Sequence, residues 1–328
     1  MIETVARLLA TRLRLPAENL SFLKVPGRHS LTLLLFRPGE ANPCYVAKRP
    51  CGPQHTPHLL AEAEGLKQAW RFVEATDLAP TIPEILVCED GVTGWLLLET
   101  ALPGKSMVNL LRAPLRREIN RSRRVLQCAF DWLARFHVRA MAYVPQDGGR
   151  LGEYLVAASG GATSEQPFRE AEELVQASAA RLEELTGGNC ALSLCHGDYH
   201  PFNLLANSEG VGVCDWGESH VGVPLLDPCR LFTALITEVP YPDDTRIVPR
   251  FHAHFFDPRE APARRAMADY LFGCAGRLGF GVEAVNAFYP VQLLRTANNR
   301  PGDRRWVEAW AEVVFLFRDR LRGRLSEA

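Results

Sequence analysis

The segment CHGDYHPFNLL (residues 195–205) places two histidines, an aspartate and an asparagine among glycine, proline and leucine. This mixture follows neither the period of an amphipathic helix nor the alternation of a half-buried strand. One interpretation is a loop in which Asp198 and Asn203 only cap backbone amides. The other is a catalytic loop, and the sequence that follows decides between them.

A zinc site is the other chemistry that this segment suggests. His196 and His200 stand four residues apart, as two zinc ligands on one face of a helix do. Gly197 between them and Pro201 directly after them disfavour a regular helix. The glutamate that follows the first histidine of a zinc protease is also replaced by Gly197. The pattern therefore argues against zinc at this position.

The segment GVGVCDWGE (210–218) predicts a short apolar strand that ends at Asp215, seventeen positions after Asp198. A loop with Asp and then Asn, followed by a strand and a second Asp before an aromatic residue and Gly, is the arrangement that kinases use for phosphoryl transfer. One carboxylate meets the attacking hydroxyl, and oxygen ligands hold Mg²⁺. We therefore expect Asp198 to be catalytic, and Asn203 and Asp215 to bind the metal.

These two motifs resemble those of the aminoglycoside phosphotransferase/choline kinase family. The catalytic loop of that family typically reads H-G-D-x-x-x-x-N, and its metal aspartate opens a D-[FWY]-[GE] strand end. LARFH (133–137) and GVPLLDPCRLF (222–232) are similar to further family segments, so the likeness covers most of the chain. The resemblance implies a kinase that moves the γ-phosphate of MgATP to a hydroxyl of a small molecule. It also implies that Asp227 braces the catalytic loop.

The segment YVAKRP places Lys48 at the end of a predicted strand, similar to the V-A-x-K lysine that contacts the α- and β-phosphates of ATP. The helical segment 58–75 carries Glu62 and Glu64, either of which could pair with Lys48. Because these positions lie about half a turn apart, only one of them can face the lysine. The pattern EAEGL aligns best with the family when Glu62 is the partner.

The segment VPGRHSL (25–31) lies between two strand-like runs, where a loop that covers the phosphates belongs. Gly27, Arg28 and Ser30 are its candidate nucleotide contacts. It has a single glycine in place of G-x-G-x-x-G, so an ordinary hairpin is the alternative.

The segment LLLETALPGKSM (96–107) resembles the connection between the two lobes of the family, with Glu99 and Ala101 offering backbone groups to adenine. Its GKS triplet mimics the end of a Walker A loop. The first glycine of that motif would fall at Glu99, so we reject a P-loop.

The order of the predicted elements indicates two lobes. Strand-like runs and one helix (58–75) precede residue 103, and most of the later chain is helical. This outline predicts an α+β, two-lobed, protein-kinase-like fold, with a small antiparallel-sheet lobe at 1–102 that binds nucleotide and a larger, mostly helical lobe at 103–328 that is catalytic. The strand-like runs are 20–25, 30–36, 44–48, 82–88 and 94–99, and the later helices include 121–141, 168–187 and 306–325.

Composition limits the partners. The chain has 328 residues, 47% hydrophobic and 23% charged, with a formal net charge of -1, which argues against a general affinity for nucleic acid. Its nine cysteines form no C-x-x-C pair and indicate reduced thiols in the cytoplasm. No apolar run reaches the roughly 20 residues of a membrane helix, and the N-terminus lacks the apolar core of a signal peptide. We therefore expect a cytoplasmic protein with no membrane or nucleic-acid partner.

The acceptor is expected to be a small hydroxyl compound: a sugar, an amino alcohol or an aminoglycoside-like molecule. From residue 280 onward the sequence has six acidic residues and eight arginines. This balance does not predict the acidic surface that a polycationic aminoglycoside would require. Two alternatives stay open, a catalytically silent nucleotide-binding regulator of the same fold and a protein kinase. The lack of an A-P-E segment and the glycine at position 197 speak against the protein kinase.

Overall fold

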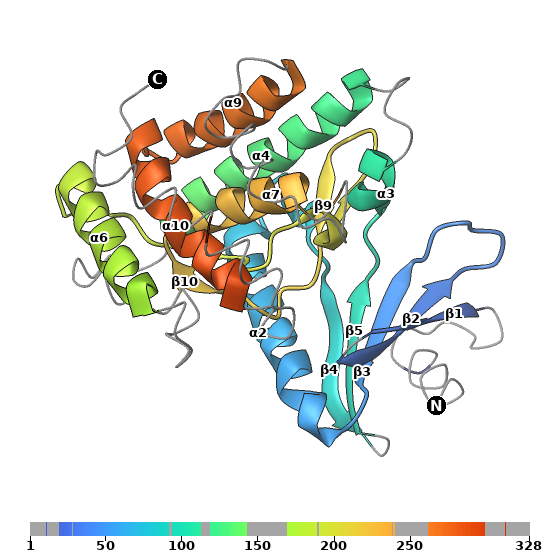
Figure 1. The fold of residues 1–328 in the computed structure, drawn as a ribbon. Coiled ribbons are helices and arrows are strands. Elements are labelled where there is room, and N and C mark those ends of the chain that lie inside the picture. The colour runs from blue at the N-terminus through green and yellow to red at the C-terminus, as the bar shows by residue number, and fades with distance from the viewer. Residues whose placement is uncertain are drawn as a thin grey trace. The chain divides into compact units, whose positions relative to one another are not determined.

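The structure is a computed structural model (Figure 1) that places the chain in two compact units. The first unit comprises Met1–Ser106 with Asn203–Ser219, and the second comprises Met107–Phe202 with His220–Ala328. Residues 203–219 group with the first unit because a strand at 204–206 pairs with one at 105–106. The predicted division after residue 102 stays a prediction. The structure describes residues 11, 20–27, 29–91, 94–112, 119–142, 169–188, 190–237, 239, 262–298 and 312.

A five-stranded antiparallel sheet forms the larger part of the first unit, with the strand order β1-β2-β3-β5-β4. Its strands lie within a few residues of the predicted runs. The strand β4 begins later than predicted, because residues 79–81 form a 3-10 turn and Pro83 has no N–H to donate to a neighbouring strand. The strands are β1 (Ser21–Pro26), β2 (Ser30–Phe36), β3 (Tyr45–Pro50), β4 (Ile85–Gly91) and β5 (Gly94–Thr100).

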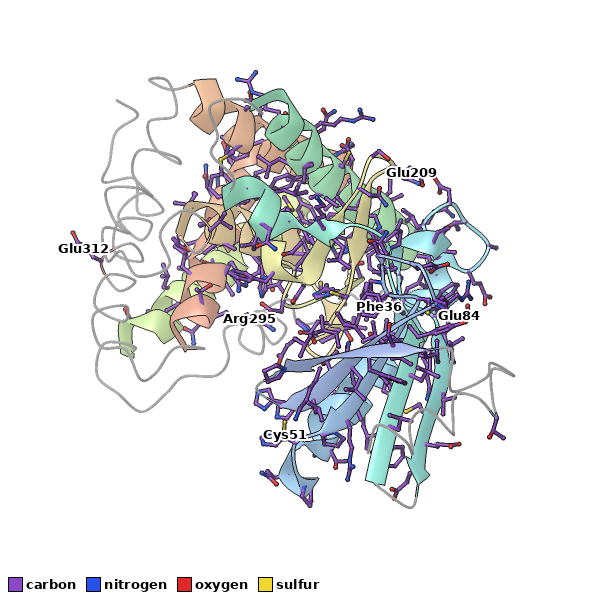
Figure 2. All side chains as sticks on the ribbon, turned by 90° about the vertical axis from the view of Figure 1, so that its right-hand side faces the viewer. Phe36, Cys51, Glu84, Glu209, Arg295 and Glu312 are labelled. Carbon is purple, nitrogen blue, oxygen red and sulfur yellow. The ribbon has the colours of Figure 1, made fainter. Side chains whose placement is uncertain are left out.

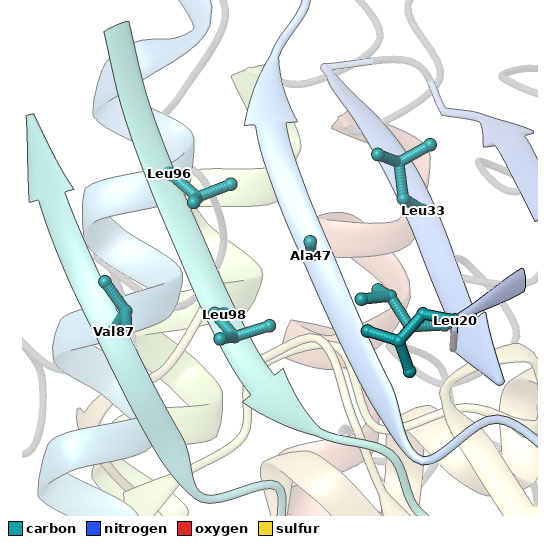
Figure 3. Packing of buried hydrophobic residues seen from close by; sticks show 7 residues of the cluster. Leu20, Leu33, Ala47, Val87, Leu96 and Leu98 are labelled. Atoms are coloured by element: carbon teal, nitrogen blue, oxygen red, sulfur yellow. The ribbon is translucent and has the colours of Figure 1, made fainter. Parts of the chain in front are cut away.

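The two faces of this sheet pack against different partners. Leu97 lies on the face covered by helix α2 (Thr56–Val73), where it packs with Leu59 and Ala63. The neighbouring residues of β5 point to the opposite face, as the alternation of a strand requires. That face holds a second cluster of buried aliphatic side chains (Figure 3), which are Leu20, Leu33, Leu35, Ala47, Val87, Leu96 and Leu98. The packing of α2 on the sheet fixes the side of the helix that faces β3.

A smaller three-stranded sheet completes the first unit. It consists of β6 (Lys105–Ser106), β8 (Leu204–Ala206) and β9 (Val211–Val213), in the order β6-β8-β9. Gly104 precedes β6 with a φ of 129°, and a Cβ there would lie 2.8 Å from the carbonyl oxygen of Ala206. Only glycine combines this φ with so close an approach.

The second unit is mostly helical. Helix α10 packs along α6 and also contacts α7, and α4 packs against α9. The predicted catalytic loop, which begins at His196, follows β7 (Ser193–Cys195), and β7 pairs with β10 (His220–Gly222). The helices are α3 (Met107–Arg112), α4 (Ile119–Met141), α6 (Arg169–Thr186), α7 (Leu226–Thr237), α9 (Pro262–Arg277) and α10 (Val282–Asn298).

The structure confirms the predicted α+β class, with an antiparallel sheet in the N-terminal region and helices after it. The predicted helices at 121–141 and 168–187 correspond to α4 and α6. The predicted helix at 306–325 falls outside the described residues, apart from residue 312. In the part of the chain that is described, each helix is too short or too polar to span a bilayer.

Candidate active site

Lys48 of β3 lies in a group of acidic side chains within the first unit. Its ammonium donates a hydrogen bond to a carboxylate oxygen of Glu62 from α2, and its Nζ lies 2.8 Å from Oε1 of Glu99 in β5. Glu64 instead is exposed and accepts a hydrogen bond from Gln68 at 3.1 Å, so it lies on the other side of the helix. The structure therefore selects Glu62 as the partner of Lys48.

Burial acts to lower the pKa of Lys48, but the carboxylates of Glu62, Glu99 and Asp215 raise it well above its usual value. The ammonium is therefore charged at neutral pH. Burial raises the pKa of Glu62 to about 7; Lys48 opposes this shift, and Glu99 and Asp215 add to it. One cation thus faces up to three carboxylates, and the group has an excess of negative charge.

The side chain of Glu99 is a member of this group that the sequence did not predict, because only its backbone was considered. It is 2% exposed, and its Oε2 has no hydrogen-bond partner among the described residues. The sequence signal for a paired side chain at Glu99 was a charged residue within the apolar run of β5, because the burial of an unpaired carboxylate costs several kcal/mol. The Ala101 N–H donates to the carbonyl of Cys44 at 3.0 Å, so a nucleotide contact at Ala101 has to use its carbonyl.

The two predicted metal ligands lie together at the open end of the β8–β9 hairpin. Leu204 pairs with Val213, and the Cys214 N–H donates to the carbonyl of Asn203 at 3.0 Å. Asn203 and Asp215 are therefore neighbours across the hairpin end. Asp215 has a φ of 64°, which is unusual for a residue other than glycine and which turns its exposed side chain out of the strand direction. An amide and a carboxylate in this position are suitable oxygen donors for Mg²⁺.

Close packing joins α2 to the segment after β9. Gly65 of α2 approaches this segment so closely that a Cβ would lie 2.4 Å from the Trp216 carbonyl oxygen and 2.2 Å from Oγ of Ser219. Trp216 itself is fully buried, and its indole N–H donates to the Val213 carbonyl at 3.2 Å. The helix that carries Glu62 and the segment that carries Asp215 therefore form one packed element.

Helix α7 fixes the first residues of the predicted catalytic loop, which belong to the second unit. The carboxylate of Asp227 accepts hydrogen bonds from the N–H groups of His196 at 2.7 Å and Gly197 at 2.9 Å. His137 of α4 brings its Nε2 to 3.2 Å from the same carboxylate. Gly197 has a φ of 82°, which explains a glycine at this position. The expected brace by Asp227 is confirmed.

Asp198 is held by two side chains. Nε of Arg230 donates to its Oδ1 at 3.1 Å, and Nε2 of His200 lies 3.0 Å from its Oδ2. Nδ1 of His200 accepts a hydrogen bond from the Phe202 N–H at 3.1 Å. The imidazole therefore carries its hydrogen on Nε2, which donates a hydrogen bond to Asp198. Burial acts to raise the pKa of Asp198, but the His200 hydrogen bond and the Arg230 charge hold it well below its usual value. Asp198 is therefore an ionised, oriented carboxylate at neutral pH.

The predicted phosphate-covering loop is a tight turn. The Gly27 N–H donates to the Ser30 carbonyl at 3.0 Å, and a Cβ at Gly27 would lie 2.7 Å from that oxygen. Ser30 begins β2. Arg28 lies outside the described residues. The roles of all three in nucleotide binding stay predictions.

Sequence reasoning missed Arg230. It stands three residues after Asp227 in the first turns of α7, a helix whose other side chains are almost all buried. An arginine in such a helix needs a partner, which was the available signal. Its partner, Asp198, is 32 residues away in the sequence, and only the tertiary structure shows which acid that is.

Comparisons with known proteins identify the family of the chain and neighbours of similar fold. The family model of the phosphotransferase enzyme family matches residues 31–270, whereas the curated proteins include no match. Choline kinase from Cryptosporidium parvum Iowa II is similar at 12% sequence identity with a TM-score of 0.56, over 99% of this chain and 96% of that chain. Choline kinase LicA from Streptococcus pneumoniae is similar at 11% identity with a TM-score of 0.56, over 97% of this chain and 98% of that chain.

A thermostable mutant of aminoglycoside phosphotransferase APH(4)-Ia, in ternary complex with AMP-PNP and hygromycin B, is similar at 16% identity with a TM-score of 0.56, over 96% of this chain and 98% of that chain. At these identities the likeness is one of fold, and these neighbours share the protein-kinase-like fold. The chain belongs to the phosphotransferase enzyme family, as its motifs implied, and it has the protein-kinase-like α+β fold of that family.

Proposed function

We propose that this phosphotransferase moves the γ-phosphate of MgATP to a hydroxyl group of a small molecule. The observation that carries the proposal is the group around Lys48, where one ammonium is fixed by Glu62 and Glu99 and lies within the electrostatic influence of Asp215. A buried lysine aimed by a helix glutamate is the device by which kinases hold the α- and β-phosphates of ATP.

Asn203 and Asp215 would hold the Mg²⁺ ion, since they offer oxygen donors and the acidic group beside Lys48 has uncompensated negative charge. When bound, Mg²⁺ neutralises charge on the phosphate oxygens. Asp198 accepts a hydrogen bond from the acceptor hydroxyl and orients it for in-line attack. Arg230 and His200 lower the pKa of Asp198, which makes it a weak base. We therefore propose that Asp198 orients the acceptor hydroxyl and does not hold its proton.

The acceptor class is a sugar, an amino alcohol or an aminoglycoside-like compound. Structural neighbours of the same fold include choline kinases and an aminoglycoside phosphotransferase bound to hygromycin B. The arginine excess after residue 280 favours a less cationic acceptor than an aminoglycoside. The nine cysteines, all of which lie among the described residues, form no disulfide, which supports a reducing, cytoplasmic environment.

A coupled assay of ADP release tests the proposal. The purified chain is incubated with MgATP and each member of a panel of aminoglycosides, amino alcohols, sugars and nucleosides, with the Asp198→Asn variant beside it. We expect acceptor-dependent ADP release that the variant lacks. ATP binding without acceptor-dependent turnover across the panel would favour the silent regulator.

A further inference from the structure

Three histidines of the first unit converge at the end of its sheet, outside the group around Lys48. His29 belongs to the turn before β2, and His55 and His58 stand at the start of α2. Each of the three residues has one ring nitrogen that lies within 4.8 Å of the corresponding nitrogens of the other two. Two of the three side chains are half-buried, and His58 is exposed.

The backbone fixes the segments that carry these side chains. The Cys51 N–H donates to the His29 carbonyl at 3.0 Å, which ties the turn before β2 to the chain that leaves β3. Figure 2 shows Cys51 at this end of the sheet. A 3-10 turn (Pro53–His55) then runs directly into α2, so His55 and His58 are three residues apart on one helical face. The convergence is therefore built into the fold.

The spacing suits a metal ion. Nδ1 of His29 lies 3.2 Å from Nδ1 of His55. Two imidazole nitrogens bound to one tetrahedral zinc ion at roughly 2.0–2.1 Å are themselves about 3.3 Å apart. The His58 ring stacks on the His29 ring with centroids 4.2 Å apart and an interplanar angle of 23°. Because His58 is exposed, a turn of its side chain can direct a nitrogen toward the same point.

We propose that His29, His55 and His58 bind one divalent transition-metal ion, of which Zn²⁺ is the representative. Imidazole nitrogens suit Zn²⁺, Cu²⁺, Ni²⁺ and Co²⁺, whereas Mg²⁺ and Ca²⁺ require oxygen donors. The positive end of the α2 dipole also disfavours a cation held by charge alone. Three histidine ligands leave a fourth position for water or another small ligand. This site is separate in ligands and in metal class from the proposed Mg²⁺ site at Asn203 and Asp215.

The bound ion would link the turn before β2 to the start of α2. Gly27 belongs to the same turn, Ser30 begins the strand that follows it, and a later turn of the same helix carries Glu62. The metal is therefore expected to restrict the motion of both segments, which hydrogen exchange of their backbone amides can measure.

Metal titration of the full chain, purified without a polyhistidine tag and stripped with a chelator, tests the site. We expect one equivalent of Co²⁺ to bind and to give the visible absorption of a nitrogen-ligated ion, and Zn²⁺ to displace it. His29→Gln and His58→Gln should each weaken the binding by at least the roughly 10- to 100-fold that the loss of an outer-shell partner costs a metal site. Zinc should also slow hydrogen exchange at residues 27–30 and at the start of α2 in the unaltered chain only.

Two variants control the experiment. His220→Gln removes a histidine of β10 and should leave binding unchanged, and Cys51→Ser removes the neighbouring thiol and should do the same. Melting temperatures without metal establish that each variant is folded. Failure of the unaltered chain to bind, stoichiometric binding that survives both histidine changes, or binding lost in Cys51→Ser would overturn the proposal. The readouts need neither ATP nor an acceptor, so they stand or fall independently of the phosphotransferase activity.

Discussion

Lys48 and Glu62 give the sharpest prediction about nucleotide binding. Removal of the lysine in Lys48→Ala eliminates a charge-assisted contact to phosphate of ~1.5–3 kcal/mol, so kcat/KM for ATP should fall by roughly 10- to 150-fold. Glu62→Gln should cause a smaller loss of the same kind, because the glutamate aims the lysine.

Glu64→Gln is the matched control, since Glu64 is exposed and accepts a hydrogen bond from Gln68. It should leave ATP kinetics unchanged. Unaltered kinetics in Lys48→Ala would contradict the assignment of the lysine to the phosphates.

The buried carboxyl of Glu62 predicts a dependence of stability on pH. Its pKa is raised to about 7, whereas an unfolded glutamate titrates near ~4.3. The folded chain therefore binds more protons than the unfolded chain between these two values, and the free energy of unfolding should fall as pH rises through that window, by up to ~1.4 kcal/mol per pH unit from this group. Urea unfolding across the window measures the slope, which Glu62→Gln should reduce; an equal slope in the variant would contradict the prediction.

Arg230 predicts a change in the pH profile of catalysis. Because its guanidinium helps to hold the pKa of Asp198 low, Arg230→Gln should raise that pKa and move the acidic limb of the kcat profile to higher pH. Arg277→Gln is the control, because Arg277 is a half-exposed arginine whose ion pair is with Asp131 on α4, at 2.5 Å. If the acidic limb of the kcat profile lies at the same pH in Arg230→Gln as in the unaltered chain, Arg230 has no influence on the pKa of Asp198.

Helix α2 connects sheet packing to the acidic group, and Gly65 tests this connection. Gly65→Ala places a Cβ 2.4 Å from the backbone oxygen of Trp216, so we expect destabilisation of about 1–3 kcal/mol and weaker ATP binding. Gly273→Ala in α9 meets nothing within 4 Å, so it should be neutral or stabilise by roughly 0.5–1 kcal/mol. Thermal unfolding of the two variants makes the comparison, and equal stabilities would contradict close packing at Gly65.

The elements themselves could be predicted from the sequence because their patterns are local. The apolar run at Leu96, Leu97 and Leu98 gives β5 its strand character, and successive side chains of the strand lie on the two buried faces of the sheet. The choice between Glu62 and Glu64 could not be derived from periodicity alone. It depends on which side of α2 the sheet covers, and only the packing of Leu59 and Ala63 determines that.

For the molecule as a whole, the motifs predicted the family, and the family model matching residues 31–270 confirms it. Contacts between side chains that lie far apart in the sequence were not predictable in the same way. Arg230 reaches Asp198 over 32 sequence positions, and His29 meets His55 over 26. Such pairs leave no local periodic signal, so only the folded chain identifies them.

The measurement that bears most directly on the proposed reaction compares Asp198→Asn with the unaltered chain, using ADP release with a responsive acceptor together with ATP affinity. The amide keeps the shape of the side chain but carries no negative charge, and its NH2 group cannot accept a hydrogen bond from the acceptor hydroxyl. Turnover should therefore fall by about 10²–10⁴ while ATP affinity stays nearly unchanged. Full turnover in Asp198→Asn would contradict phosphoryl transfer oriented by this carboxylate.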